Sequence, residues 1–522
     1  MSDNLTKTPP PLPRKENLKQ RAYLNSVTSF IDYAGAQIVG FIVSPFIVNG
    51  LGSSFYGIWQ MLSQMTNYAG MADTRATQVL KWSIANKRDV AYDEELKSEV
   101  TTALVVTGLI LPIVLVVGGI IVWYAPYITQ ADKEHYNLIR ITCSFLVLAL
   151  VISKVFNLFE SVLRGMNLGY KRMGLRAGIV AVSGGLKVLA ITQGYGLVGL
   201  SIIEVFTAVI IGTTFYIIVK QNIGWFGFGT TNFSKVVSYG KLSGWFMAFT
   251  GSKMFLLHSD KIILGYIIGP IFVTKYTITM FTSYALQGLV NAVITGVIPG
   301  IGSLYGRGEY HKVIQARKII ISLNWLLATC LGVTILLLNR SFIGLWVGEE
   351  HYAGTFENLL IILVSIQIIF FQIDSLIINV TLNMKKKVLF SSIASLLTIS
   401  IAYFLVEKYL IVGLCISILL GRAILTIGYP FILKEKMQEK QHDFSLSIIR
   451  PSITCCIFFL IAAYSSQWID LTNWLQLITA GVVSVLFIGV LYWRIGLSTE
   501  DRIDVWKILS NIKLFKKEGK GI

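Results

Sequence analysis

Charged residues are scarce in this sequence, and acidic side chains are scarcer than basic ones. Only 14% of the 522 residues are Asp, Glu, Lys or Arg, whereas 54% are hydrophobic. A soluble globular domain contains about 25% charged residues, and a single soluble core rarely grows beyond about 250–300 residues. No polar linker divides the chain into units of that size. The composition therefore excludes an ordinary soluble protein and favours a membrane protein.

The sequence also lacks the usual signs of catalysis or metal binding. It has no glycine-rich phosphate loop, no zinc motif and no constellation around a nucleophile, and the acidic pair Glu349–Glu350 with His351 fits a solvated loop. None of the cysteines has the spacing of a metal site, so we interpret all of them as small packing residues. They are Cys143, Cys330, Cys415, Cys455 and Cys456. We therefore expect no enzyme, no metal and no organic cofactor.

Long hydrophobic runs recur from Tyr23 to Arg494, each long enough to cross a bilayer as a helix. The sequence thus predicts an all-α polytopic membrane protein with about fourteen transmembrane helices. The expected ranges are 24–49, 54–80, 100–125, 136–164, 173–192, 196–220, 237–266, 270–299, 313–339, 357–384, 387–407, 410–434, 449–469 and 473–496.

The two ends of the chain differ from the apolar body. Residues 1–22 contain four prolines and scattered charges but no apolar core, which predicts a disordered basic tail and not a cleavable signal peptide. Residues 498–522 begin with an N-cap pattern, Ser498 to Asp501, and continue as a basic amphipathic segment. We expect this tail to lie on an anionic membrane surface.

Lys and Arg are distributed unevenly between alternate loops. The loops on the side of the two termini hold nearly all of them, whereas the opposite loops hold little beyond Lys133, Arg340 and Lys408. Because short basic loops stay in the cytoplasm, both termini are predicted to be cytoplasmic. This placement accounts for the net charge of +17 without a nucleic-acid partner.

The chain contains an internal repeat with an offset of 214 residues. Residues 159–200 align without gaps to residues 373–414, with nine identical positions that include Tyr195 with Tyr409 and Gly199 with Gly413. The offset corresponds to six helices, so the repeats have the same orientation and predict a pathway between two lobes. The expected organisation is an N-lobe at 23–220, a loop at 221–236, a C-lobe at 237–435 and two additional helices within 436–497.

Four segments, taken in order, resemble Wzx-type polysaccharide flippases of the multidrug, oligosaccharidyl-lipid and polysaccharide exporter superfamily. They are Leu51–Trp59, Ser259–Gly265 with Gly269, Pro270 and Tyr276, Pro299–Leu304 with Gly308–Tyr310, and Ile343–Gly348 with Tyr352. The resemblance implies twelve core helices in two lobes with alternating access. It also implies that the cargo is an oligosaccharide linked to undecaprenyl diphosphate in a bacterial cytoplasmic membrane. Its implied partners are this lipid-linked glycan, membrane lipids and other polysaccharide assembly proteins.

Ionisable side chains within the predicted helices supply the candidate site residues, because each costs at least about 2.5–3.5 kcal/mol at membrane depth. We expect cations to line a cavity and bind the diphosphate. These cavity candidates are Arg75, Lys187, Lys253, Lys261, Lys275 and Arg422. The candidates for proton or ion coupling, or for gating, are Asp374, Asp260, Glu160 and Asp73.

Salt bridges between helices are the alternative interpretation of these charges. Glu160 has Arg164 at i+4 and is expected to form a local pair. Asp374 occupies the repeat-equivalent position but has Ile378 at i+4, so it is a candidate proton or cation site or a partner for another helix.

Three other functions stay open at this point. A multidrug extruder of the same superfamily would favour an acidic cavity, which the near balance of acids and bases does not indicate. A lipid II flippase would account for the two additional helices. A membrane glycosyltransferase or polymerase would need a larger outer domain than the sequence provides. No nucleotide site is visible, so H⁺ or Na⁺ coupling, membrane potential and product consumption are all open as driving forces.

Overall fold

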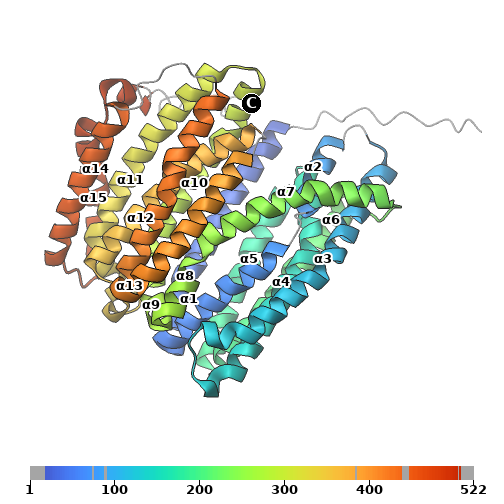
Figure 1. The fold of residues 1–522 in the computed structure, drawn as a ribbon, viewed down its shortest axis with the longest axis horizontal. Coiled ribbons are helices and arrows are strands. Elements are labelled where there is room, and N and C mark those ends of the chain that lie inside the picture. The colour runs from blue at the N-terminus through green and yellow to red at the C-terminus, as the bar shows by residue number, and fades with distance from the viewer. Residues whose placement is uncertain are drawn as a thin grey trace, which may run out of the picture. The chain divides into compact units, whose positions relative to one another are not determined.

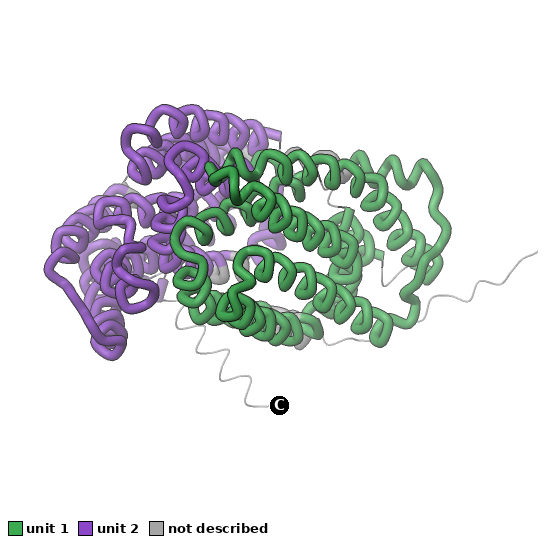
Figure 2. Tube along the Cα trace, turned by 90° about the horizontal axis from the view of Figure 1, so that it is seen from below, with its two compact units in different colours: residues 1–254 green, residues 255–522 purple. Residues whose placement is uncertain are grey.

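The computed structural model describes residues 18–72, 76–87, 91–381, 385–437, 446–503 and 505–506. Within these ranges the chain forms helices and turns and contains no β-strand, which confirms the predicted all-α class. The chain divides into two compact units, residues 1–254 and 255–522 (Figure 2). Each unit is described separately below.

The first unit consists of long helices joined by short turns (Figure 1). In it α1 packs against α5, and α4 packs against both α3 and α6. Its helices are α1 (Leu18–Ala69), α2 (Ala76–Lys87), α3 (Asp93–Ile128), α4 (Tyr136–Gly165), α5 (Tyr170–Thr192), α6 (Gly196–Asn222) and most of α7 (Phe233–His258), which continues past the unit boundary.

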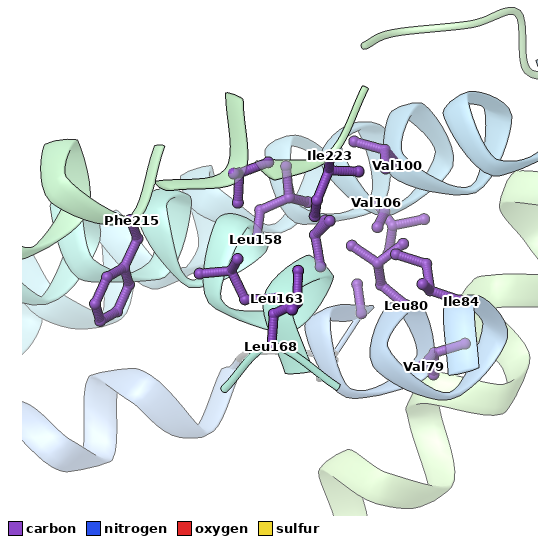
Figure 3. Close-up of a cluster of buried hydrophobic side chains, with 14 of the residues drawn as sticks. Val79, Leu80, Ile84, Val100, Val106, Leu158, Leu163, Leu168, Phe215 and Ile223 are labelled. Carbon is purple, nitrogen blue, oxygen red and sulfur yellow. The ribbon is translucent and has the colours of Figure 1, made fainter. Parts of the chain in front are cut away.

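The core of the first unit lies where α2, α3 and α4 meet (Figure 3). Leu80 and Ile84 of α2 are fully buried and lie one turn apart, so they present one apolar face. Val100 of α3, Leu158 of α4 and Val219 of α6 belong to the same cluster. A polar contact lies beside this apolar cluster. The buried carboxylate of Glu99 accepts from Lys87 at the end of α2 and pairs with Lys235 of α7. This packing fixes the ends of three helices relative to one another.

The second unit is organised around α11. This helix packs against α12, α14 and α15, and α13 packs against α12 and α8. The helices of the unit are α8 (Asp260–Ile268), α9 (Pro270–Thr279), α10 (Phe281–Gly306), α11 (Tyr310–Trp346), α12 (Thr355–Val380), α13 (Lys385–Lys436), α14 (Leu446–Ser465) and α15 (Trp474–Ile495).

The two C-terminal helices attach to α11 along one side only. Phe459 of α14 and Tyr492 of α15 are buried against Val333 and Leu336 of α11. The other side of α15 exposes a continuous apolar surface, which suits contact with lipid. Its exposed residues include Leu475, Ile478, Val482, Val483, Leu486, Phe487 and Val490.

The described parts of all fourteen predicted ranges lie almost entirely on helical backbone. Ten described helices are long and apolar enough to cross a membrane. Two of these, α1 and α13, bend at Gly52 and Leu410. α13 contains the predicted ranges 387–407 and 410–434, and α1 contains 24–49 and the first part of 54–80. The range 237–266 is divided between α7 and α8, and 270–299 between α9 and α10. The number of membrane crossings itself stays a prediction.

Two positions related by the 214-residue offset of the predicted repeat have similar backbone φ angles. Gly196 and Leu410 are 214 residues apart, and both have positive φ angles, 53° and 51°. Each is followed three residues later by a crowded glycine, Gly199 in one half and Gly413 in the other. A Cβ atom at Gly413 would lie 2.1 Å from the carbonyl oxygen of Leu405. The two positions therefore share a positive φ angle, although Gly196 begins α6 and Leu410 lies within α13.

The start of the C-terminal tail has the predicted N-cap. Ser498 accepts a hydrogen bond from the backbone N–H of Asp501 at 3.1 Å, which confirms the N-cap. The Asp501 carboxylate is buried and also accepts a hydrogen bond from Ser322 of α11 at 3.0 Å. The amphipathic segment predicted beyond this turn falls mainly on residues 507–522, outside the described residues.

The crowding at Gly413 generates a prediction. Gly413→Ala should destabilise the protein by several kcal/mol, because the new methyl group meets backbone and not a movable side chain. The readout is thermal unfolding of the purified protein in detergent. Gly119→Ala is the matched control, since nothing lies within 4 Å of its Cβ position. It should be neutral or slightly stabilising, and equal stability of both variants would contradict the proposed close approach.

Candidate functional site

The most strongly charged buried region of the second unit surrounds the bend between α7 and α8. Ser259 interrupts the helix there, and its hydroxyl donates a hydrogen bond to the Phe255 carbonyl at 2.7 Å. Such back-bonding by serine favours bending. After α8, Gly269 takes a φ of 100° and Pro270 begins α9, which suits the proline preference for a first helical turn. The Ser259–Gly265 segment that carries the family resemblance therefore forms this bend.

Asp260 is the acidic group at the bend. It begins α8, where a carboxylate is favoured by the partial positive charge of the helix N-terminus. Its Oδ1 accepts the backbone N–H of Lys261 at 2.9 Å. Its Oδ2 accepts the phenolic O–H of Tyr276 at 3.0 Å. These bonds stabilise an ionised carboxylate away from water.

Arg422 of α13 supplies the opposing charge. Its Nη2 donates to the carbonyl oxygen of Leu256 at 2.6 Å, so a cation lies at the C-terminal end of α7. The side chain is only 3% exposed, yet its Nε and Nη1 have no acceptor among the described residues. Buried donors of this kind normally have a partner, either protein, water or ligand.

Lys261 gives the bend an excess of positive charge. It is 5% exposed and lies beside Asp260, with which it interacts electrostatically. Arg422 interacts with the same carboxylate. Two buried cations thus accompany one buried carboxylate, and a site of this composition favours an additional anion. Among the described residues no cluster of His, Cys, Asp and Glu could hold a metal ion.

A second buried charge pair connects α11 and α12. Arg317 donates from Nε and Nη2 to the two oxygens of Asp374, at 2.6 and 2.8 Å. Asp374 was predicted to be a proton or cation site or a partner for another helix, and the structure gives it a helix partner. Arg317 is not among the site candidates predicted from the sequence. The signal that could have identified it was present, since the expected helix at 313–339 already contained it.

Two predicted candidates of the first unit, Glu160 and Lys187, are also paired. Glu160 accepts from Arg164 at 2.6 Å, as the i+4 spacing predicted, and from buried Arg172 at 3.0 Å. Lys187 of α5 donates to Glu204 of α6 at 2.6 Å. Pairing leaves Lys187 with less capacity to attract a phosphate than an unpaired cation would have.

The remaining candidates occupy different settings. Lys253 lies on α7 with an exposed side chain in the first unit, and Lys275 lies half-buried on α9 in the second. Arg75 and Asp73 fall outside the described residues. The bend therefore brings together Asp260, Lys261 and Arg422 of the predicted set. Tyr276 was noted in the sequence only as part of a motif, and its hydrogen bond to Asp260 gives it a positioning role.

Similarity to known proteins extends over most of the chain. No protein-family model matches the sequence. A curated protein of Shigella flexneri named "Putative O-antigen transporter" is 22% identical over 412 residues, which cover 75% of this chain and 93% of that protein. The structure of the lipid II flippase MurJ in an inward closed conformation has a TM-score of 0.67 and 15% identity, and the match covers 90% of this chain and 99% of MurJ. This chain has the MurJ fold.

The same fold extends to multidrug transporters. An inward-facing MATE transporter of the MOP superfamily matches with a TM-score of 0.61 and 13% identity, over 78% of this chain and 96% of that protein. The MurJ match covers 90% of this chain and the MATE match 78%, a difference of about the length of two transmembrane helices. The sequence resemblance to flippases of this superfamily thus agrees with similarity to a protein named as an O-antigen transporter and with a fold shared by MurJ and MATE transporters. The reported relatives are named as transporters and a flippase, and none as an enzyme.

The pair between α11 and α12 generates a prediction. Arg317→Met should lower the free energy of unfolding by about 3–5 kcal/mol, because it leaves the buried Asp374 carboxylate without its cation. The double variant Arg317→Met with Asp374→Leu should recover most of this loss, since no buried charge remains. Thermal unfolding in detergent measures both. If the double variant were as unstable as Arg317→Met, the loss of stability would not come from the unpaired Asp374 carboxylate.

Proposed function

We propose that this membrane protein is a flippase that moves an undecaprenyl-diphosphate-linked oligosaccharide across the bacterial cytoplasmic membrane by alternating access. The observation that carries the proposal is the match to the O-antigen transporter, which spans 93% of that protein. The flippase fold of MurJ supports it independently. In this function the cargo is handed to surface polysaccharide assembly, and both termini lie in the cytoplasm.

The charges at the α7–α8 bend fit this cargo. A diphosphate carries several negative charges and many acceptor oxygens, whereas Arg422 supplies two buried nitrogens without an acceptor among the described residues and Lys261 supplies a second buried cation. Lys253 and Lys275 would add positive charge along the same segment of the sequence. Asp260 would hold the cations in place while no cargo is bound. Asp260 and Asp374 stay candidates for ion coupling, with H⁺ or Na⁺ as the ion.

A lipid II flippase is the second candidate, since the MurJ match covers 90% of the chain and therefore includes helices beyond the twelve-helix core. Both candidates carry a polyprenyl diphosphate and differ in the attached glycan. Multidrug extrusion is less well supported, because cationic drugs would not favour a bend at which buried cations outnumber the carboxylate.

The function is tested by flipping in proteoliposomes. A fluorescent polyprenyl-diphosphate oligosaccharide should become accessible in the opposite leaflet only when the protein is present. Lys253→Ala should slow this flipping about tenfold or more, the effect of removing one charge-assisted contact to phosphate. Its side chain is exposed, so the variant should insert and unfold like the parent protein.

Lys408→Ala is the matched control, because Lys408 is another exposed lysine, predicted to lie at the external face. It should flip at the parent rate. Normal flipping by Lys253→Ala would remove that residue from the site and leave the function in place. Absence of flipping, together with ion-coupled efflux of a cationic dye, would overturn the proposal in favour of multidrug extrusion.

A further inference from the structure

A groove in the second unit lies apart from the charges of the α7–α8 bend. It is bounded by the first turns of α11, the end of α12 and the last three turns of α13. Its volume is about 410 Å³, within the range of small-ligand sites. The walls are mainly apolar and include Ile377, Ile427, Pro430 and Phe431. Arg422 lies one turn before the groove on α13, bonds to Leu256 and does not line it.

The length and exposure of the groove suit a hydrocarbon chain. Its lining residues on α13 run from Thr426 to Met437, which is roughly 17 Å along a helix. One leaflet of a bilayer contributes about 15 Å of hydrocarbon. Ile427 and Phe431 are 62% and 65% exposed, so the groove opens outward from the unit through an apolar rim. An acyl chain can therefore enter from the surrounding lipid.

Two basic side chains line the groove, Arg317 near the start of α11 and Lys434 near the end of α13. The distribution of Lys and Arg predicts this end to be cytoplasmic. The charge of Arg317 is balanced by Asp374, and the adjacent Glu435 accepts from Lys386. Lys434 is exposed and has no acidic partner in the described parts of the chain.

We propose that this groove binds one anionic phospholipid of the cytoplasmic leaflet. The acyl chain occupies the apolar walls, and the phosphate of the headgroup contacts Lys434. Charge complementarity supports this occupant, since basic pockets between transmembrane helices on the cytoplasmic side recognise anionic headgroups. The bound lipid joins the ends of α11, α12 and α13 and is not cargo.

Native mass spectrometry of the detergent-solubilised full-length protein tests the proposal. The probes are phosphatidylglycerol and phosphatidylcholine with the same acyl chains. The parent protein should retain phosphatidylglycerol preferentially as a single adduct. Lys434→Gln should weaken this binding about fivefold, as expected for one basic residue near an anionic lipid. Lys408→Gln, the same change at another exposed lysine of α13, should leave it unchanged.

A second variant tests the apolar walls. Ile427→Trp should fill the groove and reduce retention of both lipids, while Lys434→Gln reduces only that of the anionic one. Equal retention of the two lipids by the parent protein, or full retention by Lys434→Gln, would overturn the proposal. Displacement of phosphatidylglycerol by millimolar inorganic phosphate would show that no acyl chain is held. Stronger retention of a polyprenyl phosphate would instead assign the groove to the cargo lipid. All these readouts are independent of flipping.

Discussion

The cost of leaving a polar group without a partner in hydrocarbon governs this structure. Helices meet that constraint for the backbone, because the N–H and C=O groups of a helix are hydrogen-bonded to each other within it. Ionisable side chains can meet it by pairing, as several of those described within the helices do. Glu160, Lys187 and Asp374 all have partners at 2.6–3.0 Å. Arg422 departs from this pattern, since two of its buried nitrogens lack an acceptor among the described residues.

Arg422 lies beside an irregular stretch of backbone, the bend between α7 and α8. The bend at Ser259 exposes the end of one helix and the beginning of another, and opposite charges lie at each: Arg422 at the carbonyl end and Asp260 at the amide end. Interrupted helices in transporters commonly form binding sites for this reason. The local arrangement stabilises the break and at the same time retains donors that an anionic cargo could use.

Lipid contact imposes a different requirement on the second unit. α14 and α15 cover one side of α11 and expose apolar side chains elsewhere, so they enlarge the surface that the unit presents to the membrane. The groove beside α13 belongs to the same surface but adds a cation to it. Cargo transport and attachment to the cytoplasmic leaflet would thus use separate charges, Arg422 and Lys434, which lie on one helix.

The sequence by itself determined the all-α class, the helical ranges, the i+4 pair of Glu160 and the N-cap at Ser498, because each depends on composition or on spacing within one segment. The 214-residue repeat stays a prediction from the sequence, and the positive φ angles of Gly196 and Leu410 agree with it. The sequence also identified several of the charged residues that the structure pairs, although not Arg317. Only the tertiary structure decided their partners. Arg317 with Asp374, Lys187 with Glu204 and Tyr276 with Asp260 join residues on different helices, and the energy of such contacts depends on helix rotation and packing, which no local pattern encodes.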